Sequence, residues 1–425
     1  MREMWVARAA WLIAIAHRRS GSRPVRMWLA GILAALIVAG CSTGATASPS
    51  VAATASTTGT ASVPASPSEV LSASKSPTAT LAPLTFVPTG SMQTARDGAT
   101  ATLLKNGKVL IAGGEDAHTA LDVDFFASAE LYDPTSGKFT KTGSMSAARA
   151  QAMAVLLADG RVLIAGGEGC EDGRHCTDVT NTPPGNYVPL ASAEIYDPAT
   201  GKFARTGSMT EPGQGRTATL LADGNALIAG FHSNGDVYDP TTGVFAATSK
   251  EDGNAGGGTA TLLPGGKVLV TGASVTEAQV FDETSRKFST ISIALPAGAP
   301  KTYPDQIIGS ATLLPDGRVL FFENGYLETY DPASGTCTYD GSVSPGGDWI
   351  AATATLLKDG KVLFLGGTIN TAVLYDPTNG NTRAGSTKVA HFDQTATLLQ
   401  DGSVLIAGGQ DADDNPTASA ELFKP

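Results

Sequence analysis

The chain has 425 residues, of which 42% are hydrophobic and only 16% charged, and it contains 49 glycines and 24 prolines. This composition suits many short strands joined by tight turns and argues against a helical protein. The net charge is −11, and the six arginines and one glutamate among the first 41 residues leave about −16 for the remainder. An acidic body repels the phosphate backbone, which excludes nucleic acid as an expected partner and leaves cations and neutral sugars.

The N-terminal segment has the pattern of an export signal. Four arginines between Arg18 and Arg26 precede an uncharged apolar run from Met27 to Gly40, which is short for a membrane span but typical of a signal-peptide core. The run ends Val-Ala-Gly-Cys41, which resembles the bacterial lipobox. The resemblance implies a lipoprotein signal peptide over residues 1–40, acylation of Cys41, and an exported cell-envelope protein facing outside the cytoplasm. The alternative is a chance cysteine after an ordinary signal.

Residues 41–83 comprise this cysteine and a segment made almost entirely of Ser, Thr, Ala, Pro and Gly. Such a segment has too few bulky apolar residues to form a core, so we predict a disordered tether. Membrane contact is then expected through the lipid anchor only. A glycosylated stalk is the alternative interpretation.

From residue 84 to 425 one unit recurs seven times. Each unit contains a pair of leucines, at 103–104, 156–157, 220–221, 262–263, 313–314, 356–357 and 398–399. Each then reaches an aromatic residue ahead of a turn, at Tyr132, Tyr196, Tyr238, Phe281, Tyr330, Tyr375 and Phe423. A period of this length signals a repeat array.

Each unit predicts four antiparallel strands, a to d. The pattern ATATLL, a two-residue turn such as Asn106-Gly107, and KVLIAGG predict strands a and b joined by a type I′ hairpin. The patterns SAELYDP and KFTKTGSM predict strands c and d. Four such strands make one propeller blade, so we predict an all-β fold, a seven-bladed β-propeller.

The two ends of this region are complementary. The last unit stops at Pro425 after its strand c, whereas residues 84–92 precede the first strand a and match the strand d pattern Phe-x-x-x-Gly-Ser-Met. The N-terminal strand is therefore predicted to be the outer strand of the last blade, which closes the ring and removes an open edge.

The diglycine after strand b, the tyrosine in strand c and the aromatic in strand d resemble the kelch motif over residues 84–425. The pattern is also similar to the propeller of galactose oxidase. It departs from the family in the third, fourth and fifth units, which have Gly230-Phe231, Gly272-Ala273 and Glu323-Asn324 in place of the diglycine. In strand d, Cys337 and Thr382 replace the aromatic of two units, and we expect both to pack in the core.

The two rims of the predicted ring differ. The a–b turns are short and alike, while the b–c and d–a connections vary and carry most of the unusual side chains, so the second rim is the expected binding face. In kelch proteins the same rim binds ligands, which agrees with this expectation.

Residues seven positions before each first leucine should converge near the central channel on that rim. With close neighbours they give a predicted ligand-binding channel mouth of Arg96, Asp97, Arg149, Arg216, Gln306, Trp349, His391 and Asp393. Such side chains suit a sugar or a carboxylate through bidentate hydrogen bonds and stacking. Alternatively, Arg96 and Arg149 pair with neighbouring acids and fasten adjacent blades.

The longest b–c connections belong to the first, second and seventh units and are acidic, with Asp116, Asp122, Asp124, Glu168, Glu171, Asp172, Asp178, Asp411, Asp413 and Asp414. Oxygen-rich loops suit calcium, although no calcium-loop spacing is present and solvated acidic loops are the preferred interpretation. No other cofactor is expected. Cys170 and Cys176, in an exported protein, favour a disulfide over a metal pair.

A binding module for a carbohydrate, small-molecule or protein ligand is the favoured function. A copper-radical oxidase like galactose oxidase needs two histidines and tyrosines, and the four mature-chain histidines, His118, His175, His232 and His391, do not form that pattern. A hydrolase or lyase with paired carboxylates, such as Asp97 and Asp393, is the stronger enzymatic alternative, although no motif singles them out.

Overall fold

Short strands separated by glycine-rich turns make up the described part of the protein. The computed structural model describes residues 83–119, 122–170, 188–213, 217–230, 234–250, 258–272, 276–293, 309–323, 325–343, 352–366, 370–389 and 392–425. These residues contain strands and no helix, so they include no helix that could cross a membrane. The all-β prediction is confirmed for this part of the chain.

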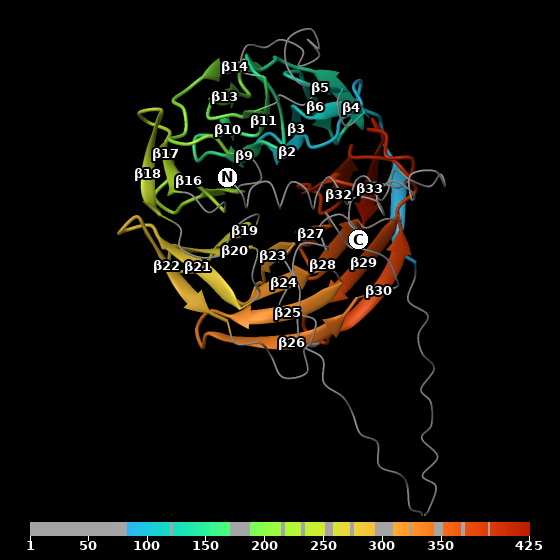
Figure 1. Cartoon of the computed structure of the whole chain (residues 1–425). Coiled ribbons are helices and arrows are strands. Elements are labelled where there is room, and N and C mark those ends of the chain that lie inside the picture. The colour runs from blue at the N-terminus through green and yellow to red at the C-terminus, as the bar shows by residue number, and fades with distance from the viewer. Residues whose placement is uncertain are drawn as a thin grey trace, which may run out of the picture. The chain divides into compact units, whose positions relative to one another are not determined.

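Seven four-stranded antiparallel sheets follow one another around a common centre within residues 83–425 (Figure 1). We number them along the chain and letter their strands a to d from the centre outwards. Sheets 1 to 3 consist of β2 (Thr100–Leu103), β3 (Val109–Ala112), β6 (Ala129–Asp133) and β7 (Lys138–Lys141); β9 (Met153–Leu156), β10 (Val162–Ala165), β13 (Ala193–Asp197) and β14 (Lys202–Arg205); and β15 (Thr217–Leu220), β16 (Ala226–Ala229), β17 (Asn234–Asp239) and β18 (Val244–Lys250). Sheets 4 and 5 consist of β19 (Thr259–Leu262), β20 (Lys267–Thr271), β21 (Glu277–Asp282) and β22 (Lys287–Ser292); and β23 (Ser310–Leu313), β24 (Val319–Glu323), β25 (Tyr326–Asp331) and β26 (Thr336–Ser342). Sheets 6 and 7 consist of β27 (Thr353–Leu356), β28 (Val362–Gly366), β29 (Thr371–Asp376) and β30 (Asn381–Ser386); and β31 (Thr395–Leu398), β32 (Val404–Ala407), β33 (Ala420–Lys424) and β1 (Thr85–Pro88).

Sheet 7 combines the two ends of this region. Strand β1 pairs antiparallel with β33, with Phe86 opposite Phe423 and their ring centroids 5.3 Å apart. The a strands of successive sheets lie next to each other, and β31 of sheet 7 also lies next to β2 of sheet 1. A side-chain bond between the hydroxyls of Thr89 and Tyr132, 2.8 Å apart, joins the end of β1 to sheet 1.

The core lies between the sheets. Strand b is buried on both faces in almost every sheet because a neighbouring sheet covers each face, which explains its runs of Val, Leu, Ile and Ala. The second leucine of each pair and the strand c aromatic are buried as well. Cys337 is only half-buried and Thr382 is exposed, so the prediction that Thr382 packs in the core is wrong. Its short polar side chain gains nothing from burial.

The a–b turns differ from the predicted two-residue type I′ hairpins. In sheet 1 the N–H of Leu104 donates to the oxygen of Lys108 and the N–H of Gly107 donates to the oxygen of Leu104, which encloses a three-residue loop. Gly107 has φ 83 whereas Asn106 is not among the residues with positive φ. The loop is therefore a type I turn followed by a left-handed glycine, the common three-residue hairpin.

The diglycine joins neighbouring sheets. The N–H of Gly114 donates to the oxygen of Arg149 at the start of sheet 2, and the N–H of Gly409 donates to the oxygen of Arg96 at the start of sheet 1, both at 2.9 Å. Gly113 and Gly114 both have positive φ, and a Cβ on Gly113 would lie 2.4 Å from the Arg149 oxygen. Only glycine allows this approach, which explains why the diglycine recurs.

Two small extra sheets lie on the rim of the b–c and d–a connections, where the sequence predicted only variable loops. One is a hairpin of β4 (Glu115–Thr119) and β5 (Asp122–Phe125), and the other contains β8 (Ala148–Ala150), β11 (Glu168–Cys170) and β12 (Val188–Pro189). Buried Phe125, Ala148 and Ala150 pack between them. These two extra sheets therefore add ordered strands to this rim at sheets 1 and 2.

Candidate functional site

Carboxyl groups from three neighbouring sheets lie within electrostatic range of one another on this rim. The N–H of Asp97 donates to the oxygen of Glu115 at 3.0 Å, and the N–H of Glu115 donates back at 2.8 Å. Glu168 of β11 and Asp393, just before β31, lie close enough to act electrostatically on the Glu115 carboxyl. We call Asp97, Glu115, Glu168 and Asp393 the carboxyl cluster.

The repeat itself positions these groups. Glu115 and Glu168 each follow a diglycine directly, and the matching residue of sheet 7 is Gln410. The Gln410 amide donates to Asp97 Oδ2 at 2.5 Å, and the N–H of Gly98 donates to Asp97 Oδ1 at 2.8 Å. The residue that matches Asp97 in sheet 2 is an alanine. Consequently no described residue donates a hydrogen bond to the Glu115 carboxyl.

Asp393 has a left-handed backbone. Its φ is 55, and the residues at the same place in sheets 1 and 2 are Gly98 with φ 58 and Gln151 with φ 50. A left-handed residue before strand a thus recurs in three sheets. Residues other than glycine rarely adopt this conformation. In sheet 7 this turn carries an exposed carboxylate.

Burial raises the pKa of two members of the cluster above that of a free carboxyl, and neighbouring charges add to the shift in Glu115. Burial raises the pKa of Asp97 to about 6, against the two hydrogen bonds that it accepts. Burial, followed by the charges of Asp97, Glu168 and Asp393, raises the pKa of Glu115 to about 8. Since the pKa of Glu115 is about 8, this carboxyl is mostly protonated at neutral pH.

Stability should accordingly fall as pH rises. The folded protein retains a proton on Glu115 that the unfolded chain releases near its ordinary pKa of 4.5, so the free energy of unfolding declines between about pH 4.5 and 8. Melting temperatures at pH 5 and pH 8 test this, and Glu115→Gln should show a shallower decline than the wild type. Equal declines in the two proteins would mean that Glu115 titrates normally.

The predicted role of Arg96 in the channel mouth is corrected by its burial. Its side chain is 1% exposed, and the guanidinium donates to the oxygens of Gly113 and Ser128 at 2.7 and 3.0 Å and pairs with Glu130 at 3.3 Å. Glu130 also accepts the backbone N–H of Gln93 at 2.8 Å. The guanidinium is directed to these buried acceptors because each of them needs a donor.

Arg149 repeats this arrangement in sheet 2. It is fully buried, donates to the oxygens of Gly166 and Ser192 at 2.7 and 2.9 Å, and lies 3.6 Å from a carboxylate oxygen of Glu194. Both arginines form the ion pairs with neighbouring acids that the alternative interpretation expected. Each pair lies within one sheet, however, where it links the d–a connection that enters the sheet to strand c. Neighbouring sheets are joined by the backbone oxygens of the same arginines instead.

Other predicted residues divide into two groups. Asp97 and Asp393 lie on the expected rim in the carboxyl cluster. Outside the described residues lie Arg216, Gln306, Trp349, His391, His175, His232 and Cys176, together with the side chains of Cys170 and His118. The predicted disulfide and any copper-type histidine set thus concern residues that the structure does not describe.

The acidic connections show no calcium geometry where they are described. Asp411 Oδ1 accepts the N–H groups of Asp413 and Asn415 at 2.9 and 3.0 Å, so this carboxylate closes its own loop. No three Asp, Glu, His or Cys side chains of the described part are grouped so that they could hold a metal ion. Glu168, which the sequence placed among the calcium candidates, lies in the carboxyl cluster.

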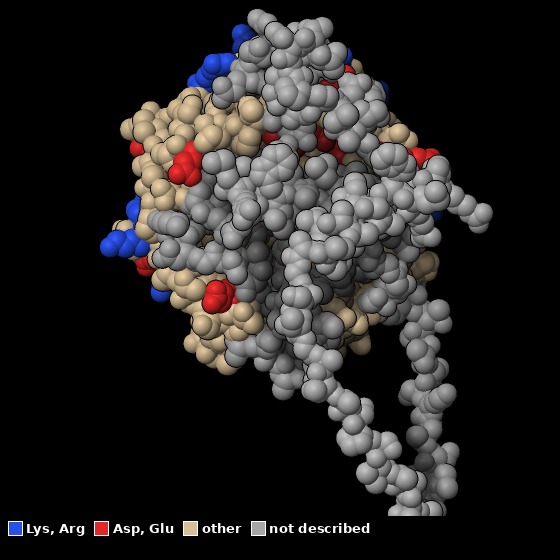
Figure 2. Space-filling view, viewed as in Figure 1, with Lys and Arg blue, Asp and Glu red and all other residues tan. Residues whose placement is uncertain are grey.

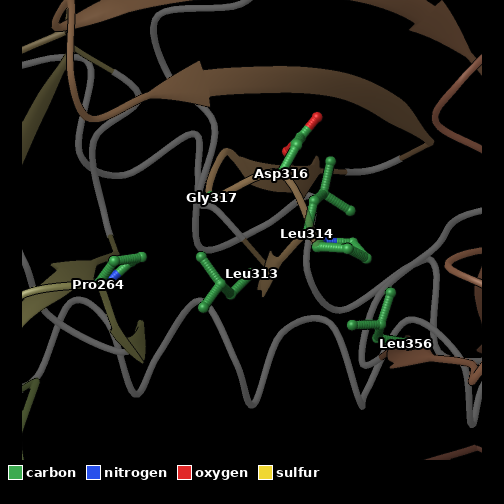
Figure 3. A pocket seen from close by; sticks show the side chains of 7 residues that line it. Pro264, Leu313, Leu314, Asp316, Gly317 and Leu356 are labelled. Atoms are coloured by element: carbon green, nitrogen blue, oxygen red, sulfur yellow. The ribbon is translucent and has the colours of Figure 1, made fainter.

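The opposite rim has a shallow apolar hollow of about 440 Å³ among the a–b turns of sheets 4 and 5 (Figure 3). Pro264 and Pro315 lie on it. At the same place in sheet 1, Lys105 Nζ donates to the oxygen of Ala158 in the next turn at 2.5 Å. Proline has no such donor, so these turns are not bridged in the same way. The hollow offers little chemistry for selecting a ligand.

Comparison with known proteins identifies the fold. No protein-family model and no curated protein sequence matches the chain. Among solved structures, the chain is similar to a fungal alcohol oxidase of the AA5 family in complex with copper, at 15% identity and a TM-score of 0.62, covering 80% of this chain and 76% of that one. It is also similar to streptogramin B lyase, at 13% identity and a TM-score of 0.56, covering 80% and 98%. Both have propeller-type folds, and this chain has a β-propeller-type fold.

Sequence reasoning missed Glu115, whose pKa burial and neighbouring charges raise to about 8. A signal was present, since Gly-Gly-Glu occurs after strand b in both the first and second repeats. A residue directly after the diglycine lies at the start of the b–c connection, and therefore on the rim that the sequence predicted as the binding face.

Proposed function

We propose that this protein is an exported, lipid-anchored propeller of seven kelch-like blades that binds a hydroxyl-rich ligand, a carbohydrate by preference, on the b–c and d–a rim. The seven sheets would be the blades, and β1 would close the ring as the outer strand of the last one. The pairing of β1 with β33 and the contact between β31 and β2 support closure. The recurrent diglycine and the buried strand c aromatic support the kelch assignment.

The carboxyl cluster is the observation that carries the binding proposal. A protonated Glu115 can donate a hydrogen bond, while the neighbouring Asp97, with a pKa of about 6, can accept hydrogen bonds from hydroxyl groups at neutral pH. Sugar hydroxyls both donate and accept, so this mixture of groups suits them. Glu115 and Glu168 belong to the extra strands β4 and β11 of this rim, whereas the opposite rim consists of short, similar turns. Trp349 and His391 complete the proposed site by their place in the repeat.

Acid–base catalysis is the second candidate. Glu115, with a pKa of about 8, and Asp97, with a pKa of about 6, have the properties of a proton donor and a proton acceptor in a hydrolase or lyase. Turnover of a bound polysaccharide that is lost in Glu115→Gln, with binding retained, would favour the enzyme. Ligand-dependent stabilisation without turnover would favour the binding module.

A glycan-array screen of residues 84–425 followed by substitution tests the binding rim. For a ligand found in this way, Glu115→Ala and Trp349→Ala should each weaken affinity by about 1 to 3 kcal/mol, as expected for anchoring contacts. Lys361→Ala, in an a–b turn of the opposite rim, should leave affinity unchanged. Isothermal titration measures each affinity, and melting curves verify folding. If only Lys361→Ala lost affinity, the ligand would lie on the rim of the a–b turns, which would contradict the proposal.

Replacing Cys41 tests the anchor. Cys41→Ala should release the protein from the membrane fraction, because the sulfur of Cys41 is the proposed acylation site. Fractionation and labelling with a radioactive fatty acid measure the outcome, and Cys337→Ala is the matched control. Unchanged retention together with unchanged lipid labelling would contradict the lipoprotein assignment.

A further inference from the structure

Two polar links recur at the outer edge of neighbouring sheets, and we call each contact between two such sheets a junction. In one link, the N–H of a glycine just after strand d donates to the oxygen of the glycine in the next sheet's c–d turn at 2.9 Å. In the other, the preceding threonine and the next sheet's strand c tyrosine share a hydrogen bond of 2.8 Å between their hydroxyls. Junctions 7–1, 1–2 and 2–3 have both links, made by Gly90–Gly137 with Thr89–Tyr132, Gly143–Gly201 with Thr142–Tyr196, and Gly207–Gly243 with Thr206–Tyr238.

The same three junctions are also joined nearer the centre. There the second glycine of the diglycine donates its N–H to a backbone oxygen of the next sheet at 2.8 to 2.9 Å. The three bonds run from Gly409 to Arg96, from Gly114 to Arg149 and from Gly167 to Gly213. Sheets 7, 1, 2 and 3 are therefore held by the same polar bonds at both the inner and the outer edge.

Sheet 5 lacks the outer links on the side of sheet 4. The place of the threonine is taken by Ile291, which packs in the same apolar cluster as Tyr330 and cannot bond to its hydroxyl. That hydroxyl makes no hydrogen bond with another described residue. Sheets 4 and 5 are joined by a long bond from the hydroxyl of Thr261 to the oxygen of Ala311, at 3.4 Å.

Sheet 5 lacks the outer links on the side of sheet 6 as well. Asp340 stands where the other sheets have threonine, and it accepts a hydrogen bond from the hydroxyl of Thr329 within its own sheet. The carboxylate of Asp340 and burial raise the pKa of Tyr375 in sheet 6, but the two side chains are not hydrogen-bonded. Between residues that the structure describes, no hydrogen bond or ion pair joins sheets 5 and 6.

Two other junctions without the repeated links have substitutes. Between sheets 3 and 4, Arg286 pairs with Asp223 at 2.6 Å. Between sheets 6 and 7, Lys358 Nζ donates to the oxygen of Gln400. Figure 2 shows basic side chains at the edge of the molecule near β18 and β22, the outer strands of sheets 3 and 4. Strand d of sheet 5, TCTYDGS, has no lysine or arginine for such a pair.

Apolar packing does not single out sheet 5, because each junction has its own cluster of buried apolar residues. The stacked rings of Phe322 and Phe364, with centroids 4.4 Å apart, lie in junction 5–6. The apolar hollow of Figure 3 is nevertheless lined mainly by Leu313 to Gly317, which form the end of strand a and the a–b turn of sheet 5. The difference between sheet 5 and the others thus lies in the missing polar bonds and in this open turn.

We propose that sheet 5 is the part of the fold that opens first, by separating from sheets 4 and 6 while sheets 7, 1, 2 and 3 stay packed. Local opening is expected where few bonds cross to the neighbouring elements. The opening exposes the rings of Phe322 and Phe364 to solvent. This inference goes beyond the proposed function and holds with or without a ligand on the rim of the b–c and d–a connections.

Hydrogen exchange of the full-length protein, followed by mass spectrometry, tests the proposal. Strand b has buried apolar residues in every sheet, so its amides can be compared between sheets. Protection factors in β24 should be at least about tenfold lower than in β3 and β10, and should depend less on urea, as local opening exposes less surface than global unfolding does. Protection in β24 equal to or higher than that in β3 and β10 would overturn the proposal.

Restoring the missing hydroxyl provides a second test. Ile291→Thr gives Tyr330 a partner of the kind that Thr142 gives Tyr196, and Ile291→Val is its matched control because valine has the shape of threonine without the hydroxyl. Amides of β24 should exchange about threefold more slowly in Ile291→Thr than in Ile291→Val. Thr142→Val should instead speed exchange in β10 and leave β24 unchanged. Equal exchange of β24 in the two Ile291 variants would mean that the missing link does not control the opening, and would overturn the proposal.

Discussion

Deleting residues 84–92 should destabilise all seven sheets together, with a loss of more than about 4 kcal/mol in the free energy of unfolding. The deletion removes β1 and its buried anchors, Phe86 at 3% exposure and Met92 at 5%. Burial of two such side chains contributes about 1.5 to 3 kcal/mol each. The deletion also exposes the edge of β33, which pairs with β1 from Thr85 to Pro88. Urea unfolding followed by circular dichroism measures the loss.

Two further variants make this result interpretable. Phe86→Ala retains the whole chain and should cost about 3 to 5 kcal/mol through the cavity that it leaves beside Phe423. Deleting residues 42–78, which belong to the predicted tether, should leave the unfolding curve unchanged. A protein without residues 84–92 that unfolds at the wild-type urea concentration would refute the closing role of β1.

Arg149→Ala should reduce the free energy of unfolding by about 3 to 5 kcal/mol, the usual cost of removing one partner of a buried ion pair. The substitution leaves the Glu194 carboxylate buried and deprives the oxygens of Gly166 and Ser192 of their donor. Desolvation by burial lowers the pKa of Arg149, and Glu194 opposes that shift. Chemical unfolding of the variant measures the effect.

The conservative variant separates charge from geometry. Arg149→Lys restores a positive charge but cannot reach both carbonyl oxygens and the carboxylate, so its stability should fall between those of wild type and Arg149→Ala. A stable Arg149→Ala protein with impaired ligand binding would instead return this arginine to the channel mouth and contradict its structural role.

The repeat made the strands predictable, because the same order of strand patterns and turn residues recurs in all seven units. It also made equivalent positions predictable: Arg96 and Arg149 do occupy the same place in successive sheets. What the pattern could not give was the direction of the side chain. An arginine near a channel can turn toward solvent or toward buried acceptors, and the deciding acceptor, the oxygen of Ser128, becomes visible only when the b–c connection is folded.

The turn type was mispredicted for a related reason. Asn-Gly fits both a type I′ hairpin and a type I turn with a following left-handed glycine, and the choice depends on how many residues the flanking strands leave between them. The carboxyl cluster depends on neighbours even more. The raised pKa of Glu115 arises from burial, followed by the charges of Asp97, Glu168 and Asp393, so it depends on the folded structure and no local pattern reveals it.

The partnership of β1 with β33 also orders events in time. Thr85 faces Lys424, so a chain that leaves the ribosome from its N-terminus carries β1 without a partner until β33 has emerged. Sheets 1 to 6 can form from contiguous segments as they appear, whereas sheet 7 must wait. Formation of sheet 7 is thereby coupled to the delivery of β33, and a product cut short before β33 would retain β1 as an unpaired strand that a protease or chaperone can recognise.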